Sequence, residues 1–240
     1  MRITFCTTCM NYTKYLKQVY LHNLIVARDY NCDFVLVNYN SEDDMDDWIR
    51  GKDFKSFILS NKLLYYHTIE PLFWRFGHAK NVSHRLGTGD VLCNLDSDNF
   101  LTKEYLDWLF DLFSNNRNII TEGNGHGGGG RVAVYKEDFY EVGGYEEQNI
   151  TIGINDHKDF VDRVCLLKRD CIQNPVEFIG YITQPSKERL STINQIIATG
   201  QKISHKRPNY AAKGIINPNK NTGFGHCKLK DYNGNKIVLK

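Results

Sequence analysis

The sequence lacks any apolar stretch long enough to cross a bilayer, which would need about 20 consecutive apolar residues. It also lacks a recognisable secretion signal. Residues 1–8 read as a short strand, without the long apolar segment and small-residue cleavage site of a signal peptide. We therefore expect a protein without a transmembrane segment that works in the cytoplasm.

Cysteine is too sparse and too irregular to form a disulfide framework. The seven cysteines are an odd number and are scattered from Cys6 to Cys227. Such spacing is typical of reduced thiols in an intracellular protein. The pair Cys6-x-x-Cys9 has the spacing of a redox motif, but no other feature supports a redox fold. We interpret both as small side chains packed beside a sheet.

Disorder is excluded, because the chain is not poor in apolar residues. Hydrophobic residues make up 41% and aromatic residues 12% of the 240 residues. A chain of this length and composition can bury the core of one large α/β domain.

Basic residues are unevenly distributed. Residues 185–240 contain eleven Lys or Arg against two acids, a net charge of +9, so residues 1–184 have a net charge of −7 within a chain of +2. This asymmetry suits nucleic-acid binding, a cationic flap over a phosphate-bearing ligand, or a solvated surface tail. Charge alone favours the solvated tail. Because the tail has few aromatics and no recognition motif, nucleic acid is not expected as a partner.

Strand-like and helical patterns alternate over the first 120 residues. This order predicts an α/β fold with a mostly parallel sheet covered by helices on both faces. Ligands of such sheets bind outside the carboxyl ends of the strands. The expected strands are 3–7, 34–37, 63–67, 91–95, 119–120, 131–135 and 178–182. The main expected helices are 12–20, 79–86, 103–113, 158–168 and 186–199, and Asn233-Gly234 predicts the turn of a closing hairpin.

Two carboxylates directly follow the apolar strand 91–95, in the triplet Asp96-Ser97-Asp98. Carboxylates one residue apart at the end of a strand can face one point, where their oxygens suit Mg²⁺ or Mn²⁺. Alternatively, the triplet forms an Asx turn and caps the next helix, because Asp and Ser favour both. The triplet alone favours this second interpretation.

The residues before the triplet change that balance. The run 77–98 resembles the stretch A-R-N-x-G…A-x-G-D-x-x-x-x-L-D-x-D of family 2 glycosyltransferases and of β-1,4-galactosyltransferase-like families, with Lys80-Asn81, Gly89-Asp90 and 95–98 at matching positions. The resemblance implies a single-domain GT-A fold and a metal-dependent glycosyltransferase. It implies Mn²⁺ or Mg²⁺ on Asp96 and Asp98, and donor contacts from Lys80, Asn81, Asp96 and Ser97.

Two segments on the acceptor side carry the same resemblance. Residues 143–147 are similar to the element G-G-[FY]-D-E, and residues 153–163 to the cluster G-x-G-x-E-D-x-D-[FI]-x-x-R. Asp156 then stands at the Glu of the cluster and His157 at the Asp that would act as general base. Since an inverting transferase needs a base for the acceptor hydroxyl, we expect Asp156 or His157 to serve. Alternatively, the acids only cap the following helix.

The remaining site residues also come from the resemblance. Residues 202–209 are similar to the galactosyltransferase region in which a His completes the metal site, which implies His205 as a metal ligand with Lys206 and Arg207 near the diphosphate. Donor-base recognition follows the first two strands of these folds, at Thr7, Thr8, Asn38 and Asn40 here. The usual pattern there is D-[DN]-x-S, so Asn38 leaves the nucleobase open, although a UDP-sugar is the expected donor.

Together these features predict transfer of a sugar from a nucleotide diphosphate to a hydroxyl of a glycan or protein, with inversion unless both candidate bases lie away from the attacked face. Residues 1–200 would form the catalytic domain, with a donor half 1–120 and an acceptor half 121–200, and residues 201–240 a basic flap completing the donor site. The alternatives are a nucleotide-sugar-binding protein with lost or weak catalysis and a nucleic-acid-binding module. The sequence leaves homo-oligomerisation open.

Overall fold

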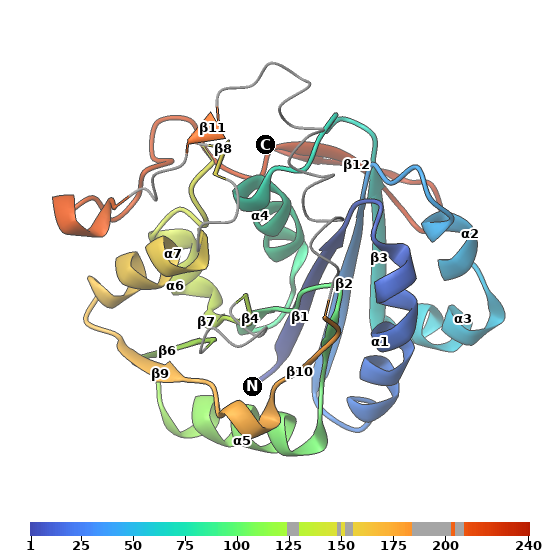
Figure 1. Ribbon diagram of the computed structural model, residues 1–240, viewed down its shortest axis with the longest axis horizontal. Coiled ribbons are helices and arrows are strands. Elements are labelled where there is room, and N and C mark those ends of the chain that lie inside the picture. The colour runs from blue at the N-terminus through green and yellow to red at the C-terminus, as the bar shows by residue number, and fades with distance from the viewer. Residues whose placement is uncertain (124–129, 148–149, 152–155, 184–202, 205–208) are drawn as a thin grey trace.

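One nine-stranded sheet forms the centre of the protein. The computed structural model describes residues 1–123, 130–147, 150–151, 156–183, 203–204 and 209–240. Within these ranges the strand order is β13-β12-β3-β2-β1-β4-β7-β6-β9 (Figure 1). The strands are β1 Ile3–Cys9, β2 Cys32–Tyr39, β3 Leu63–Thr68, β4 Val91–Asn94, β6 Ile119–Glu122, β7 Ala133–Tyr135, β9 Asp170–Gln173, β12 Cys227–Asp231 and β13 Lys236–Leu239.

Most of these strands run in one direction. β3, β2, β1 and β4 are parallel neighbours, and β6 is parallel to β9. β7 runs against β4 and β6, and β12 runs against β3 and β13. The prediction of a mostly parallel α/β sheet is therefore confirmed.

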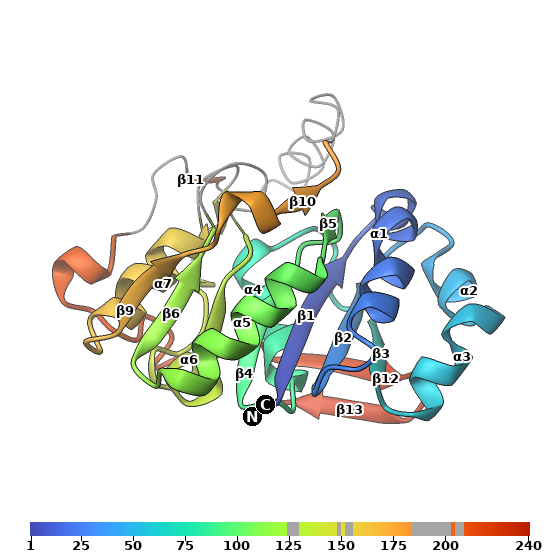
Figure 2. The same cartoon turned by 90° about the horizontal axis from the view of Figure 1, so that it is seen from below.

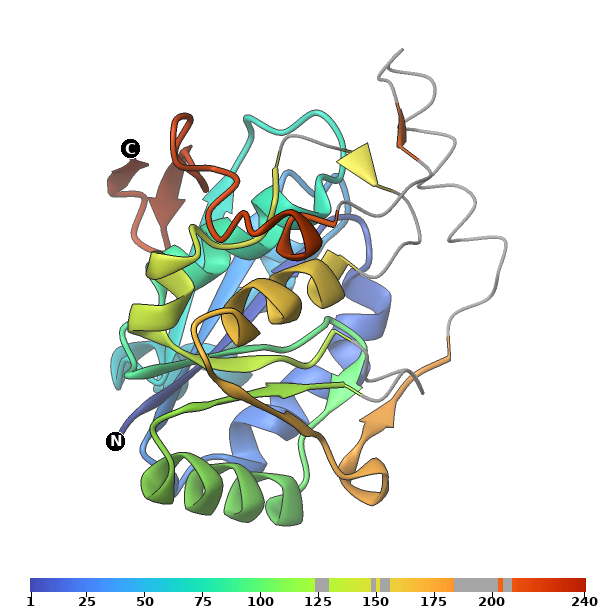
Figure 3. The ribbon, with the colours of Figure 1, turned by 90° about the vertical axis from the view of Figure 1, so that its left-hand side faces the viewer.

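Helices cover both faces of this sheet. α1, α3 and α5 contribute to the cluster that contains Phe5 and Phe34, whereas α6 and α7 pack on the opposite face with Cys6. Figure 3 shows α5 on one side of β6 and β9, and α6 and α7 on the other. Phe5 and Cys6 face opposite layers because side chains alternate along a strand. The helices are α1 Thr13–Val26, α2 Met45–Ile49, α3 Lys52–Leu59, α4 Phe76–Leu86, α5 Lys103–Asn115, α6 Lys136–Glu141 and α7 Asp156–Cys165.

The buried stripe of α1 shows how the pattern places a helix. Leu16, Tyr20 and Leu24 recur every four residues and are at most 1% exposed. They pack against β2, whose eight residues are all buried. Burial of apolar surface contributes about 25 cal/mol per Å², so this packing, more than helix propensity, stabilises α1.

The C-terminal hairpin predicted from Asn233-Gly234 is confirmed. Asp231 Oδ1 accepts hydrogen bonds from the backbone N–H groups of Asn233 and Asn235, and Gly234 has a φ of 86°. The pattern does not predict where the hairpin docks: β12 pairs with β3, so β13 becomes the edge of the central sheet (Figure 2).

Two small ladders complete the described elements. β5 Asn99–Phe100 pairs antiparallel with β10 Gly180–Tyr181, and β8 Ile150–Thr151 pairs parallel with β11 Ile203–Ser204. Short 3₁₀ turns span Val176–Phe178 and Ala211–Lys213. The expected helix 186–199 and most of the Gly-rich stretch 123–130 lie outside the described residues. Within the described ranges, none of the helices combines the length and hydropathy of a membrane span.

Candidate functional site

The triplet Asp96-Ser97-Asp98 lies at the carboxyl end of β4, beside the carboxyl end of β1. The backbone N–H of Leu95 donates to Cys6 O at 2.9 Å, and Thr7 Oγ1 donates to Leu95 O at 2.8 Å. All three triplet residues are partly exposed. They are therefore held against the sheet and remain accessible, at the edge where ligands of such sheets bind.

The triplet does not cap the helix that follows it. α5 begins at Lys103, and the side chain of Thr102 accepts the hydrogen bond from Tyr105 N at 3.2 Å. Thr102 is thus the N-cap, and β5 separates it from the triplet. The interpretation that Asp96 and Asp98 cap this helix is wrong, whereas the expected turn is present, since Ser97 and Asp98 form a turn closed by the hydrogen bond from Asn99 N to Asp96 O at 3.1 Å.

Both carboxylates accept hydrogen bonds from neighbouring asparagines. Asn94 Nδ2 donates to Asp96 Oδ1 at 2.9 Å, and Asn99 Nδ2 donates to Asp98 Oδ1 at 2.8 Å. Gly130 lies against the other Asp96 oxygen: a Cβ built on it would stand 2.1 Å from Oδ2. Ionised carboxylates offer hard oxygen ligands, so the donor set suits Mg²⁺ or Mn²⁺.

The expected third metal ligand, His205, lies outside the described residues, as do Lys206 and Arg207. Among the described residues, no group of three or more His, Cys, Asp or Glu side chains is arranged to hold a metal ion. The metal set of Asp96, Asp98 and His205 stays a prediction.

The predicted donor-base residues lie at the carboxyl ends of β1 and β2, with Thr7, Thr8 and Asn38 inside the strands and Asn40 directly after β2, and each makes a contact within the protein. Thr8 Oγ1 donates to Ala79 O at 3.0 Å, and Asn38 Oδ1 accepts from Ser41 N at 2.8 Å. Asn40 has a φ of 59° and donates through Nδ2 to Pro71 O at 2.7 Å. These bonds tie the end of β1 to α4 and fix the loop that follows β2, while contact with a nucleobase stays a prediction.

The two cysteines of the Cys6-x-x-Cys9 motif do not form a redox pair. Cys6 packs in the cluster beside α6 and α7, and Cys9 in the cluster on the opposite face of the sheet. Burial raises the pKa of Cys9 to about 12 and that of Cys6 well above its usual range. Buried thiols of this kind are unreactive, which confirms their interpretation as packing residues. The Tyr12 backbone and, more weakly, the side chains of Thr13 and Ser97 oppose the rise in the Cys9 pKa.

Lys80 and Asn81 lie on α4 against the Gly143–Glu147 turn, so the fold brings two of the sequence motifs together. Asn81 is fully buried: Oδ1 accepts from Tyr145 N at 2.7 Å, and Nδ2 donates to Tyr145 O at 2.8 Å and Glu147 Oε1 at 2.7 Å. Lys80 is 7% exposed, with its ammonium 5.2 Å from the centroid of the Tyr145 ring. Their donor contacts stay a prediction.

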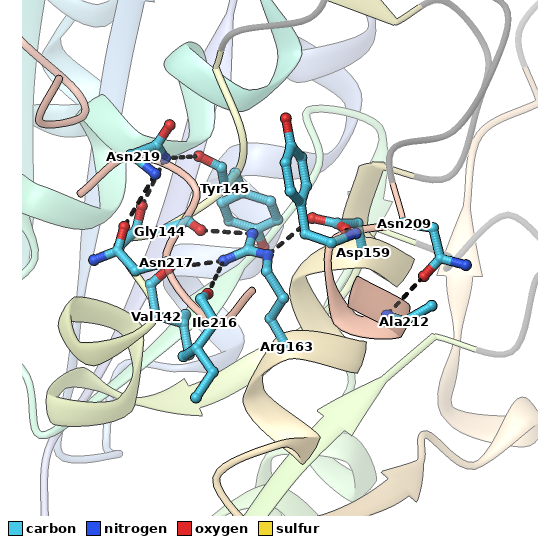
Figure 4. Close-up of polar contacts among 12 residues, drawn as sticks. Val142, Gly144, Tyr145, Asp159, Arg163, Asn209, Ala212, Ile216, Asn217 and Asn219 are labelled. Atoms are coloured by element: carbon cyan, nitrogen blue, oxygen red, sulfur yellow. Dashed lines mark hydrogen bonds and ion pairs between the residues drawn. The ribbon is translucent and has the colours of Figure 1, made fainter. Parts of the chain in front are cut away.

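Arg163 links α7 to the same turn and to the C-terminal segment (Figure 4). Its Nε donates to Asp159 Oδ2 at 2.9 Å, Nη1 to Val142 O at 2.8 Å and Nη2 to Gly144 O at 2.8 Å. Asp159 Oδ1 also accepts from Tyr210 N at 3.2 Å. Burial lowers the pKa of Arg163, and the Asp159 carboxylate opposes this shift. The Asp and Arg of the acceptor-side cluster therefore position α7.

The two candidate bases stand at the start of this positioned helix. Asp156 is the first residue of α7, and His157 follows it, partly buried. β11 ends at Ser204, one residue before His205, and pairs with β8, which ends five residues before Asp156. The ladder ends on both strands before residues 152–155 and 205–208, so the position of His205 relative to the candidate bases lies outside the described residues.

Several residues near the site carry no motif that sequence reasoning could use. Glu122, at the carboxyl end of β6, pairs with Lys158 at 3.4 Å and accepts a hydrogen bond from Gln173. Its position at the end of a predicted strand is the one signal that points to it. Arg131 is fully buried and contacts Asn99. No sequence pattern distinguishes this buried arginine from a surface arginine that follows a loop.

Comparison with solved structures gives the fold a name. The chain superposes on a mannosyltransferase from Pyrobaculum calidifontis in complex with GDP-Man and Mn²⁺, with a TM-score of 0.62 and 14% identity over 88% of this chain and 67% of that one. It also matches residues 1–349 of Staphylococcus aureus TarS in complex with UDP-GlcNAc (TM-score 0.63, 15% identity, 80% of this chain and 61% of that one).

The chain has a GT-A fold. A third similar structure with this fold is glucosyl-3-phosphoglycerate synthase from Mycobacterium tuberculosis in complex with Mn²⁺, UDP and glucosyl-3-phosphoglycerate (TM-score 0.53, 15% identity, 82% of this chain and 78% of that one). No model of a protein family matches the sequence, and no curated protein is similar to it. The predicted GT-A architecture is confirmed, while a β-1,4-galactosyltransferase-like subfamily is not.

Proposed function

We propose that this GT-A protein is a metal-dependent glycosyltransferase that moves a sugar from a nucleotide diphosphate to a hydroxyl acceptor. One observation carries the proposal. The carboxylates of Asp96 and Asp98 follow a central strand of the sheet, are partly exposed and are each held by an asparagine. Three proteins of similar fold were solved with nucleotides or nucleotide sugars, two of them with Mn²⁺.

In this proposal Asp96 and Asp98 hold Mn²⁺ or Mg²⁺, with His205 as a further ligand. When bound, the cation supplies positive charge beside the departing nucleotide diphosphate. Lys206 and Arg207 would add positive charge at the same phosphates. Of the basic flap predicted over residues 201–240, residues 227–239 instead form the β12–β13 edge of the central sheet. The segment before them would fold over the donor and exclude water that would otherwise hydrolyse it.

The acceptor side supplies the base. His157 or Asp156, at the start of α7, would take the proton of the acceptor hydroxyl while that oxygen attacks the anomeric carbon from the face opposite the nucleotide, with inversion. Thr7, Thr8, Asn38 and Asn40 would contact the nucleobase, for which uracil is the first candidate, and Lys80, Asn81 and Ser97 the rest of the donor. The acceptor would be a glycan or protein hydroxyl.

A nucleotide-sugar-binding protein with weak or no turnover is the second candidate. It is favoured by one feature, since His157 stands where the resembling families carry an acid. Donor binding without hydrolysis or transfer would distinguish it from an enzyme.

The test combines donor binding with turnover. Thermal shifts with UDP-, GDP- and other nucleotide sugars, with Mn²⁺ or with EDTA, should reveal a metal-dependent donor whose hydrolysis is then followed. Asp98→Asn should remove both the shift and the hydrolysis, whereas Asp29→Asn, at an exposed site, should change neither. Turnover at the wild-type rate by Asp98→Asn would show that the metal assignment is wrong.

A further inference from the structure

We propose that Asn94 and Asn99 are positioning residues that hold the Asp96 and Asp98 carboxylates in the orientation needed for cation binding. The inference deepens the proposed function and rests on it, since it concerns the same cation site. It assigns roles to two asparagines that belong to no sequence motif.

The orientation of the Asn99 side-chain amide is fixed by its contact with Arg131. It is fully buried, and its Oδ1 accepts a hydrogen bond from Arg131 Nη2 at 3.3 Å. A guanidinium has donors but no acceptor, so the amide oxygen must face Arg131. The NH₂ group must then face Asp98, whose Oδ1 it contacts at 2.8 Å.

Arg131 is itself held firmly, which makes it an anchor for this chain of contacts. Its guanidinium is fully buried and lies 4.7 Å from the centroid of the Tyr105 ring. Nη2 donates to Phe100 O at 2.7 Å, and longer bonds reach the carbonyls of Phe178 and Gly180. The backbone of Asn99 is held as well, because its carbonyl accepts from Asn23 Nδ2 at 2.8 Å.

Asn94 orients the Asp96 carboxylate in the same way, by donating a hydrogen bond to it. It is 3% exposed, and its Nδ2 donates both to Asp96 Oδ1 at 2.9 Å and to Gly130 O at 2.7 Å. Both partners are acceptors, so the NH₂ group cannot be exchanged with the amide oxygen. Gly130 also packs against Asp96 Oδ2, where a Cβ would stand 2.1 Å away.

The Asn94–Asp96 contact and the Asn99–Asp98 contact are both anchored on one pair of consecutive residues. Asn94 is tied to Gly130 and Asn99 to Arg131, so both carboxylates take their orientation from one short segment at the end of the Gly-rich stretch. Carboxylates oriented before the cation arrives need not lose rotamer freedom on binding. Hydrogen-bond partners of metal ligands typically contribute about 10- to 100-fold to metal affinity.

Mn²⁺ binding to the full chain without nucleotide is the direct test, because it does not require turnover. The electron paramagnetic resonance signal of free Mn²⁺ gives the Kd. Asn99→Leu and Asn94→Leu should each raise this Kd by about 10-fold or more. Gly130→Ala removes no hydrogen-bonding side chain but should also raise the Kd, because its Cβ displaces the Asp96 carboxylate.

Asn219→Leu is the matched control. Asn219 is 1% exposed and donates to the carbonyls of Gly143 and Tyr145, so its loss costs stability without touching the triplet. Its Kd for Mn²⁺ should equal that of the wild type. Circular dichroism shows which variants fold, and if Asn99→Leu does not fold, Asn94→Leu and Gly130→Ala decide the question.

The outcomes separate the two proposals. A wild-type chain that binds no Mn²⁺ overturns the metal assignment of the proposed function and this inference with it. A wild-type chain that binds Mn²⁺, with folded Asn94, Asn99 and Gly130 variants of unchanged Kd, overturns the positioning role alone. A raised Kd in Asn219→Leu equal to that in Asn99→Leu would show that general destabilisation is the cause, and would also overturn it.

Discussion

Arg163 and Asp159 form an ion pair from which water is excluded. Their side chains are 0% and 2% exposed, with Nε 2.9 Å from Oδ2, one helical turn apart on α7. The same arginine reaches the carbonyls of Val142 and Gly144, so the pair joins the helix that carries the candidate bases to the turn that faces Asn81. Loss of this ion pair should therefore lower the free energy of unfolding directly and affect catalysis only through the position of α7.

Asp159→Asn should lower the free energy of unfolding by about 3–5 kcal/mol, because it leaves the Arg163 guanidinium buried without its counter-charge. Urea denaturation followed by fluorescence measures this. Asp107→Asn is the control, because Asp107 and Lys103 are exposed and an asparagine oxygen can still accept the hydrogen bond from the Tyr30 hydroxyl. This variant should unfold at nearly the wild-type urea concentration. Equal midpoints for the two variants would contradict the structural role of the buried pair.

Two glycines with nearly the same backbone conformation allow a sharper comparison. Gly144 has a φ of 65° and a Cβ there would stand 2.3 Å from Asn81 Oδ1, whereas Gly214 has a φ of 68° with nothing within 4 Å of the Cβ position. Gly214→Ala should cost about 1 kcal/mol for the left-handed backbone alone. Gly144→Ala should cost about 3 kcal/mol, since the Cβ also displaces Asn81 from Tyr145.

The difference between these two alanine variants in thermal or urea unfolding reports the contact between Asn81 and the turn. Similar losses in both would mean that Asn81 moves aside without cost. In that case its amide would be available to a donor, as its sequence motif suggests, and the structural assignment would fail.

His84 should make stability depend on pH. Burial lowers its pKa from 6.5 to about 3, and Nδ1 lies 2.7 Å from Lys80 O while Nε2 has no partner among the residues that the structure describes. Below pH 6.5 the unfolded chain takes up a proton that the folded chain does not. This contribution to stability is therefore complete above pH 6.5 and is lost as the pH falls toward 3, by about 1.4 kcal/mol per pH unit.

His84→Phe keeps the ring that stacks on Phe139 and removes the titration. Between pH 7 and pH 5 the wild type should therefore lose about 2 kcal/mol more unfolding free energy than the variant. Denaturant titrations at the two pH values measure this, and groups common to both proteins cancel. Parallel pH profiles would show that His84 takes up its proton at the same pH in the folded and the unfolded chain, and would contradict a lowered pKa.

Much of the site could be located from sequence because its signals are local. The apolar run 91–95 followed by Asp96-Ser97-Asp98 predicts a buried strand that ends in acids, and the structure places both at the carboxyl edge of the sheet. Gly143 and Gly144 predict a turn, and both have positive φ. Such patterns depend on the periods of strands and helices and on the conformational freedom of glycine, all of which act over a few residues.

Tertiary structure alone decided which of these residues support one another. No local sequence pattern predicts the docking of β12 beside β3 or the contact of Arg131 with Asn99. The partners are separated by more than 30 residues, and each could have packed elsewhere. Asn81 makes the same point: its motif suggests a donor contact, yet the folded chain buries its amide against Tyr145. The sequence by itself determined the α/β elements and the strand end that carries the acids. The burial of polar groups against distant carbonyls, which must be satisfied once water is excluded, was decided only when the chain packed.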